Sequence, residues 1–226
     1  ESKPKQEGYY YTDKKVLKAK FEGKSTEAVF EKIHQENFWE NSDSVSGPGS
    51  GLEQTATIRS ALPELWKRYD IRSILDIPCG DFFWMKEMDL SNITYTGGDI
   101  VSKIIEKNKQ EYEREGISFR KMNLILSELP KVDLVLCRDC LVHFSFADIG
   151  EAIANLKKSQ STWLLTTHFE ENRRNNDIIT GDWRPLNLCN RPFHFPEPEA
   201  IINEQCTELD GSYSDKSLAL WRIADL

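Results

Sequence analysis

The fold of this chain is decided by the stretch Ser73-Ile74-Leu75-Asp76-Ile77-Pro78-Cys79-Gly80-Asp81-Phe82-Phe83-Trp84. A short apolar run ends in an acid, passes through a Pro-Cys-Gly turn and continues with the spacing of an amphipathic helix. An apolar run of this length, bounded by turn residues, is typical of a buried parallel strand. In open α/β folds, ligands bind at the carboxyl ends of such strands. The stretch therefore predicts a strand that delivers a carboxylate and a glycine to a ligand site.

Strands and helices alternate along the chain after this point. We predict strands at 93–100, 117–123, 132–137 and 162–168, and helices at 52–69, 82–88, 101–115 and 146–158. This order predicts a doubly wound parallel sheet with right-handed crossovers. Residues 204–209 and 217–223 flank the turn-rich segment 210–215 and predict an antiparallel hairpin. Together these segments predict an α/β fold with a mostly parallel, seven-stranded sheet that ends in a hairpin.

A helical cap is expected before the sheet. The apolar positions between 13 and 40 fit two short helices broken near Gly23, and 41–51 is rich in glycine and serine. That second segment is either a linker or a loop that contacts a ligand. We divide the chain into a cap and loop at 1–51 and a sheet domain at 52–226. Because the chain begins with Glu1, we expect a processed chain or one part of a longer, multidomain protein.

Composition excludes several classes of partner. The 226 residues contain 29 Lys and Arg against 37 Asp and Glu, for a net charge of −8. We expect no nucleic-acid partner, because sequence-independent binding to nucleic acid needs a basic face. We also expect no membrane partner, because no apolar run approaches the roughly 20 residues that span a bilayer. Cys137 and Cys140 lack the second pair that a zinc site needs, so core thiols and a reducing, cytoplasmic location are expected.

Three motifs carry a resemblance to a known family: Leu75-Asp76-Ile77-Pro78-Cys79-Gly80, Gly98-Asp99 and Asp139-Cys140-Leu141-Val142-His143. Over residues 52–226 the chain resembles the class I S-adenosylmethionine (SAM)-dependent methyltransferases. The first motif of that family is usually an acid followed by alternating glycines, and Pro78 stands where the first glycine normally lies. The resemblance implies methyltransferase activity with SAM as cofactor.

The resemblance also implies roles for residues after the third and fourth predicted strands. Asn123 stands where members of the family bind the amino group of adenine. A structural role for Asn123 is the alternative. Arg138 and Asp139 border the place where methyl donor and acceptor meet. A surface ion pair is the alternative for Arg138.

The remaining cofactor residues follow from chemistry. A glycine at position 80 lets the backbone approach a ligand closely, and Asp76 is placed to bind the ammonium of the methionyl group. Asp99 lies 19 residues after Gly80, close to the separation of about 20 expected for an acid that binds ribose hydroxyls. The alternative for Asp99 is an N-cap of the following helix. We place Pro78 and Ile100 beside them in the cofactor site.

Asp81 argues against a dinucleotide cofactor. A dinucleotide places its pyrophosphate at the helix N-terminus after the first strand. An acid in that turn repels phosphate, and the G-x-G-x-x-G spacing is absent. SAM carries a sulfonium cation and no phosphate, so we assign Asp81 to its site, with an ordinary N-cap as the alternative.

A hydroxyl acceptor requires a general base, because it loses its proton as it attacks. His143 and His168 follow the fourth and fifth predicted strands and are the candidate bases, with Asp139 beside them; packing is the alternative for both. His194, in a proline-rich loop, is assigned to the acceptor side or to packing. We expect His34 on the surface of the cap.

The long segment 169–198 combines aromatic, amide and charged side chains, and loops of this length are usually functional or disordered. We predict an ordered acceptor-binding insert that recognises a sugar, a glycan or another small polyhydroxyl compound through Asp177, Asp182, Trp183, Arg184 and His194. The cap and its glycine-serine segment are expected to close over the same rim.

A divalent metal is also open, because hard cations take oxygen ligands and lower the pKa of a bound hydroxyl. The candidate ligands are Asp139, His168, Asp177 and Asp182. No ligand spacing in the chain enforces such a site.

The sequence thus favours an O-methyltransferase that works by in-line transfer with a general base. The alternatives are an N-methyltransferase of a small molecule or peptide, and a non-catalytic methyltransferase-like domain that binds a partner.

Overall fold

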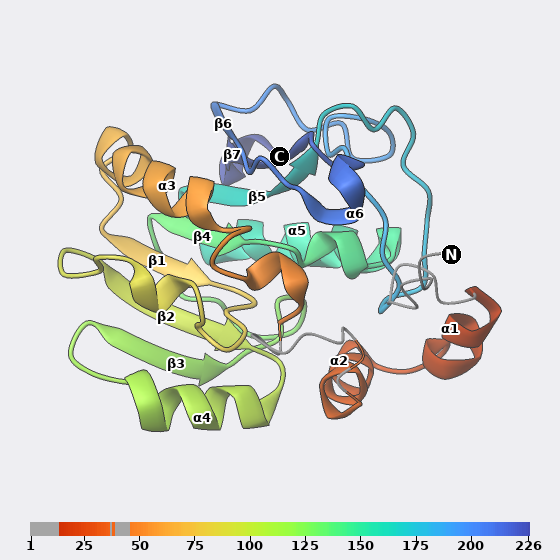
Figure 1. Ribbon diagram of the computed structural model, residues 1–226, viewed down its shortest axis with the longest axis horizontal. Helices are drawn as coiled ribbons and strands as arrows, with labels where there is room; N and C mark the ends of the chain where they lie inside the picture. The colour runs from red at the N-terminus through yellow and green to blue at the C-terminus, as the bar shows by residue number, and fades with distance from the viewer. Residues whose placement is uncertain (1–13, 37, 39–45) are drawn as a thin grey trace, which may run out of the picture.

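The computed structural model of the protein describes residues 14–36, 38 and 46–226, and the features expected at the other positions, including the segment 41–45, lie outside these residues. A seven-stranded sheet with the order β3-β2-β1-β4-β5-β7-β6 forms the centre of the fold (Figure 1). Its strands are β1 (Ser73–Asp76), β2 (Thr94–Asp99), β3 (Ile117–Lys121), β4 (Leu134–Cys137), β5 (Trp163–Phe169), β6 (Ala200–Asn203) and β7 (Lys216–Arg222). Strands β1 to β5 pair in parallel, and β7 pairs antiparallel with both β5 and β6. The predicted mixed sheet is confirmed.

Helices cover both faces of this sheet. They are α3 (Ala56–Arg68), α4 (Ser102–Tyr112) and α5 (Phe146–Ser159), with the short turns η4 (Leu141–His143) and η5 (Ile223–Asp225) at strand ends. Ile74 of β1 joins a core that includes residues of α3 and α4, whereas Leu75 joins the core beneath α5. Successive strand residues point to opposite faces, so the doubly wound arrangement is confirmed. Among the described residues, no helix combines the length and apolar character needed to cross a membrane.

The cap forms the two expected helices, α1 (Lys14–Phe21) and α2 (Thr26–Gln35). Gly23 lies between them with φ +74°, a left-handed conformation that glycine adopts without steric cost. Figure 1 shows both helices beyond the carboxyl ends of β1, β2 and β3. A Cβ at Gly181 of the insert would lie 2.6 Å from Val29 and 2.9 Å from Phe21. The insert therefore packs directly against the cap.

The helix predicted at 82–88 is wrong, because only the three-residue turn η3 (Met85–Glu87) forms there. Phe82 has φ +59° and is 1% exposed. Its ring packs 5.2 Å from the ring of Tyr95 and 5.1 Å from that of Phe119. Burial of this ring against the sheet thus overrides the helical spacing.

The first strand of the predicted hairpin is displaced. It forms at β6, before the predicted range 204–209, and the short turn α6 (Glu208–Gly211) occupies the end of that range. Glu204 is 3% exposed, and its carboxylate accepts two hydrogen bonds from Arg138. β6 itself ends at Asn203, although the Glu204 N–H still donates to the Lys216 carbonyl of β7 at 2.9 Å.

Candidate active site

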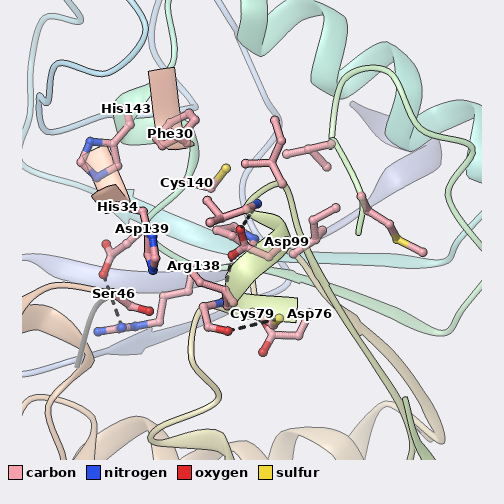
Figure 2. Close-up of a pocket in the computed structure, with 18 of the residues that line it drawn as sticks. Phe30, His34, Ser46, Asp76, Cys79, Asp99, Arg138, Asp139, Cys140 and His143 are labelled. Carbon is pink, nitrogen blue, oxygen red and sulfur yellow. Dashed lines mark hydrogen bonds and ion pairs between the residues drawn. The ribbon is translucent and has the colours of Figure 1, made fainter. Parts of the chain in front are cut away.

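A cavity with an empty volume of about 1100 Å³, its open mouth included, lies at the carboxyl ends of the parallel strands (Figure 2). The sheet domain contributes residues from 76–81, 99–104, 122–124 and 138–144. The cap contributes residues of α2, and the segment 46–50, which includes the turn η2 (Pro48–Ser50), supplies Ser46 and Ser50. Helix α2 and the end of the glycine-serine segment therefore line the rim, whereas no described residue of α1 does.

Asp76 ends β1 at the floor of this cavity. It is 4% exposed, and its Oδ2 accepts a hydrogen bond of 2.6 Å from the Tyr95 hydroxyl. Burial raises the pKa of Asp76 to about 7, against the opposing effects of that bond and of the Arg138 charge. A buried carboxyl of this kind ionises more readily when a cation binds beside it.

Asp99 ends β2 next to Asp76. Its Oδ1 accepts from the Val101 N–H at 2.9 Å, and its Oδ2 accepts from the Gly80 N–H at 3.2 Å. Burial raises the pKa of Asp99 to about 6, although these backbone bonds lower it. Asp99 thus supports the backbone before α4 without being its N-cap, which is Val101, and it also lines the cavity.

Gly80 lies where two segments far apart in sequence meet. It has φ +54°, and a Cβ there would lie 2.1 Å from Ser46 Oγ. The Ser46 hydroxyl donates to Asp81 Oδ1 and accepts from the Asp81 N–H, both at 3.3 Å. The close approach at Gly80 is therefore made by Ser46. Asp81 is not an N-cap, because the following turn begins only at Met85.

Arg138 belongs to a buried ion network, not to a surface pair as one interpretation held. Its Nε donates to Glu204 Oε1 at 3.0 Å, and its Nη2 donates to Glu204 Oε2 at 2.7 Å and to the Gly49 carbonyl at 2.8 Å. Lys216 Nζ donates to Asp139 Oδ2 at 2.7 Å. Burial opposes ionisation of Asp139, but the charges of Lys216 and Arg138 outweigh it and hold the pKa of this carboxyl well below its usual range.

Sequence reasoning missed Glu204 and Lys216. They lie 66 residues after Arg138 and 77 residues after Asp139, respectively. Neither belongs to a local motif, so no signal in the sequence could have found them.

His143 lies in η4 and lines the cavity. Its Nδ1 lies 2.9 Å from the Asp182 carbonyl oxygen, and since a carbonyl only accepts, Nδ1 carries the proton. Nε2 is therefore the basic atom of the neutral ring. Burial lowers the pKa of His143 to about 4, although the Asp182 bond and the Asp139 charge raise it. The imidazole is neutral at pH 7.

The structure does not bring His168 to the cavity, so its assignment as a base is not supported. Its Nδ1 accepts from the Leu188 N–H at 3.2 Å, and its ring packs 5.4 Å from the ring of Trp221. Burial lowers the pKa of His168 to about 4. This histidine packs, as the alternative interpretation held.

The insert does not line the cavity, so the acceptor-binding roles predicted for its side chains are not supported. Asp177 Oδ1 accepts from the Phe146 N–H at 2.8 Å, which stabilises the start of α5. Trp183 packs 4.8 Å from the ring of Tyr213. His194 is exposed and has φ +53°.

The other two predicted insert residues position the turn that carries His143. Arg184 is 6% exposed, and its guanidinium donates to the carbonyls of Leu141, Val142 and Phe144 at 2.7 to 3.0 Å. Asp182 holds the His143 ring through its backbone carbonyl. The insert therefore supports the site from behind.

The four candidate metal ligands Asp139, His168, Asp177 and Asp182 do not come together. No group of three or more His, Cys, Asp or Glu side chains suited to a metal ion occurs within 14–36, 38 and 46–226. All five cysteines are free, and four of them are buried, so the interpretation as core thiols is confirmed for those four.

His34 was expected on a surface but lines the cavity together with Phe30 of the same helix. Burial and the charge of Lys103 lower the pKa of His34. In Figure 2, His34, Phe30, His143 and Asp139 lie toward one side of the cavity, away from the buried acids of the strand ends. Where α2 docks depends on tertiary packing, so the sequence carried no signal for this role.

Residues 75–159 match the family model of a methyltransferase domain. A search of the curated proteins found no significant match. Human N-acetylserotonin methyltransferase in complex with SAM is similar in structure, with 15% identity, a TM-score of 0.55 and coverage of 88% of this chain. This chain spans only 60% of the length of that enzyme.

Two bacterial structures are also similar. N-methyltransferase NodS from Bradyrhizobium japonicum WM9 has 14% identity, a TM-score of 0.51 and coverage of 75% of this chain and 96% of its own. Magnesium protoporphyrin IX methyltransferase from Synechocystis PCC 6803 with bound SAM has 13% identity, a TM-score of 0.50 and coverage of 69% and 82%. The chain thus has a Rossmann-like fold of the kind found in methyltransferases, and its residues 75–159 match the model of a methyltransferase domain.

Proposed function

We propose that this methyltransferase domain binds SAM and transfers its methyl group to a hydroxyl group of a small acceptor. One observation carries the proposal. A single cavity holds the buried acids Asp76 and Asp99 at the strand ends and the neutral base His143 on another wall.

The acids suit a cationic nucleoside. Both carboxylate oxygens of Asp99 accept backbone N–H groups, and a carboxylate has further lone pairs that can accept from a ribose hydroxyl. Burial raises the pKa of Asp76. A nearby cation, such as the methionyl ammonium, would stabilise its ionised carboxylate. The SAM present in the human and Synechocystis structures supports this assignment.

Asn123 lines this cofactor wall, but its side-chain oxygen is already engaged. Its Oδ1 accepts from the N–H groups of Ile125 and Leu126 at 2.8 and 3.3 Å. The side-chain carbonyl expected to meet adenine therefore supports the turn after β3. Pro78 and Ile100 line the same wall, and they shape it without polar side chains.

SAM, when bound, supplies an electrophilic methyl group on a sulfonium. The chain's own task is to hold the acceptor hydroxyl in line and to remove its proton. His143 takes that proton at Nε2, while Nδ1 stays bonded to the Asp182 carbonyl. The permanently ionised Asp139 stabilises the resulting imidazolium, since its charge raises the pKa of His143.

The side chains that line the cavity limit which classes of acceptor we propose. A sugar or polyhydroxyl acceptor was inferred from the insert 169–198, and none of the described insert side chains lines the cavity. We therefore retain a hydroxyl acceptor on the evidence of His143 and give no preference to a sugar. N-methylation, the reaction named for NodS, is the second candidate, because an amine acceptor would not need His143.

The test compares His143→Ala with the matched control His168→Ala, which removes a histidine outside the cavity. Turnover is measured with labelled SAM on a panel of hydroxyl and amine acceptors. We expect the first variant to lose roughly 10²- to 10⁴-fold in kcat, with unchanged binding of S-adenosylhomocysteine, and the second to retain turnover in its folded fraction. Full turnover by both variants would favour N-methylation of an amine acceptor. Failure of the wild-type protein to bind SAM or S-adenosylhomocysteine would exclude the methyltransferase.

A further inference from the structure

We infer that the acceptor is a neutral aromatic hydroxyl compound, selected by the cap helix α2. This inference rests on the proposed function and specifies its acceptor. It is carried by the charge of the cavity wall and by the side chains that α2 presents to it.

The cavity wall disfavours an anionic acceptor. Its described residues include four aspartates, Asp76, Asp81, Asp99 and Asp139, and a single permanent cation, Arg138. Asp76 and Asp99 have raised pKa values and Asp139 is paired with Lys216 and Arg138, so this wall offers no excess positive charge to a phosphate or carboxylate on the acceptor.

Arg138 cannot supply positive charge to a ligand. Two of its nitrogens already donate to Glu204 and the Gly49 carbonyl, and Nη1 lies 3.4 Å from Asp139 Oδ2. Lys103 acts on His34 from α4, but it is exposed and does not line the cavity. Within the described wall, an anionic acceptor therefore finds no cation without an acidic partner.

Helix α2 presents one face to the cavity. Thr26, Phe30, Ile33 and His34 line it, and their spacing places them on one side of a helix. Phe30 of α2 packs both against the core beneath α5 and against the cap cluster, and this packing holds the face in place. The exposed ion pair of 2.5 Å between Glu27 and Lys121 adds little to it.

The side chains opposite this face are aromatic. The Phe30 ring lies 5.9 Å from the Phe144 ring and 6.5 Å from the His143 ring, the latter edge to face. Aromatic groups at such separations attract further rings through edge and face contacts. Because these rings pack against one another and all line the cavity, an aromatic acceptor would lie against their cavity-facing side, near the base.

His34 supplies the polar contact of the α2 face. It lies on the same side of the cavity as His143 (Figure 2), and its lowered pKa favours the neutral ring, which can both donate and accept. We assign to His34 a hydrogen bond with a second hydroxyl group on the acceptor ring. Phe30 contacts the ring itself.

The experiment uses calorimetry on the full chain saturated with S-adenosylhomocysteine. The probes are 2-naphthol, 2,7-dihydroxynaphthalene, 6-hydroxy-2-naphthoate and methyl glucoside. We expect both neutral naphthols to bind, the carboxylate to bind at least about tenfold more weakly, and methyl glucoside to bind more weakly still. Methyl transfer from labelled SAM should follow the same order.

Variants of α2 test its role. Phe30→Ala should weaken both naphthols about tenfold, and His34→Ala should weaken only the dihydroxy compound. The controls are Phe193→Ala and His194→Ala, which alter an aromatic ring and an imidazole outside the cavity and should change neither. Binding of S-adenosylhomocysteine should be unchanged in all four variants.

The outcomes separate the two levels of the proposal. If S-adenosylhomocysteine does not bind the wild-type protein, the proposed function and this inference both fail. If it binds, the inference is overturned when the carboxylate or methyl glucoside binds as tightly as 2-naphthol, when neither naphthol binds, or when Phe30→Ala leaves naphthol affinity intact. The methyltransferase proposal then stands with a different acceptor.

Discussion

Replacing Glu204 with alanine should destabilise the fold more than any ordinary surface substitution, because it leaves the Arg138 guanidinium buried without its main partner. The two side chains are 5% and 1% exposed and share two hydrogen bonds, at 3.0 and 2.7 Å. Removing one partner of a buried ion pair costs about 3–5 kcal/mol. That is a large part of the roughly 5–15 kcal/mol by which a domain is stable.

Neighbouring charges determine where in the range of about 3–5 kcal/mol the loss of unfolding free energy for Glu204→Ala falls. Asp139 stays 3.4 Å from Arg138 and moderates the loss, whereas Lys216, 3.6 Å from Glu204, also loses a counter-charge. We therefore expect about 4 kcal/mol, the middle of the range. Glu204→Gln, which keeps an acceptor but removes the charge, should lose less.

Urea unfolding followed by circular dichroism measures the effect. With a slope of about 3 kcal/mol/M, a loss of about 4 kcal/mol lowers the midpoint by roughly 1.3 M. Glu199→Ala, at an exposed position just before β6, is the matched control and should shift the midpoint little. If the two variants unfold at the same urea concentration, the reasoning is refuted, and the Arg138 charge must be satisfied elsewhere.

Three further predictions concern the cavity. Gly80→Ala places a side chain at φ +54° and 2.1 Å from Ser46 Oγ, so we expect a loss of at least about 1–2 kcal/mol in urea unfolding and weaker SAM binding in calorimetry. Adding Ser46→Gly should recover part of both, and a single variant as stable as the wild type would contradict the contact. Because the pKa of Asp76 is raised to about 7, its contribution to stability is present below about pH 4 and is lost as the pH rises through 7. Asp76→Asn should therefore be the more stable apo protein in thermal unfolding at about pH 8, but not at low pH, and should bind SAM more weakly; lower stability than the wild type at high pH would contradict the assigned shift. Finally, the pKa of His143 near 4 predicts that kcat rises with pH through that region and is flat at neutral pH, whereas a midpoint near 6.5 in the pH–rate profile would show an imidazole that is not desolvated.

The parallel half of the sheet could be predicted because its signals are local. Leu134–Cys137 is a continuous apolar run, and all four residues are buried in β4, as expected for a strand covered on both faces. All residues of β5 are likewise buried, although Thr166, Thr167 and His168 interrupt its apolar run. The edge strand β6 is different, because its four residues are only half-buried or exposed in alternation. Such a short edge strand carries little sequence signal, and its position was predicted incorrectly.

Part of the candidate site was predictable for a topological reason. Asp76 and Asp99 end neighbouring parallel strands, and the carboxyl ends of such strands meet at one edge of the sheet. Gly80 follows the first of them, so its amide reaches Asp99. The wall that we assign to the cofactor could therefore be predicted from the residue types at the strand ends.

The acceptor wall was not predictable. His34 comes from a helix whose docking depends on the cap cluster with Phe21, Val29 and Ile33. The insert looked like an acceptor loop because of its composition, but its polar side chains hold the backbone of the insert and of η4. Composition does not distinguish a side chain that binds a ligand from one that binds its own backbone.

By itself, then, the sequence determined the alternation of strands and helices, the acids at the strand ends and the histidine that follows β4, because each depends on residues close together in the chain. Tertiary structure alone decided that α2 rather than the insert faces the cavity, that His168 packs against Trp221, and that Arg138 is neutralised by Glu204. These features depend on which distant segments share a desolvated space. In such a space, pairing and burial set the role of a side chain, and its neighbours in sequence do not.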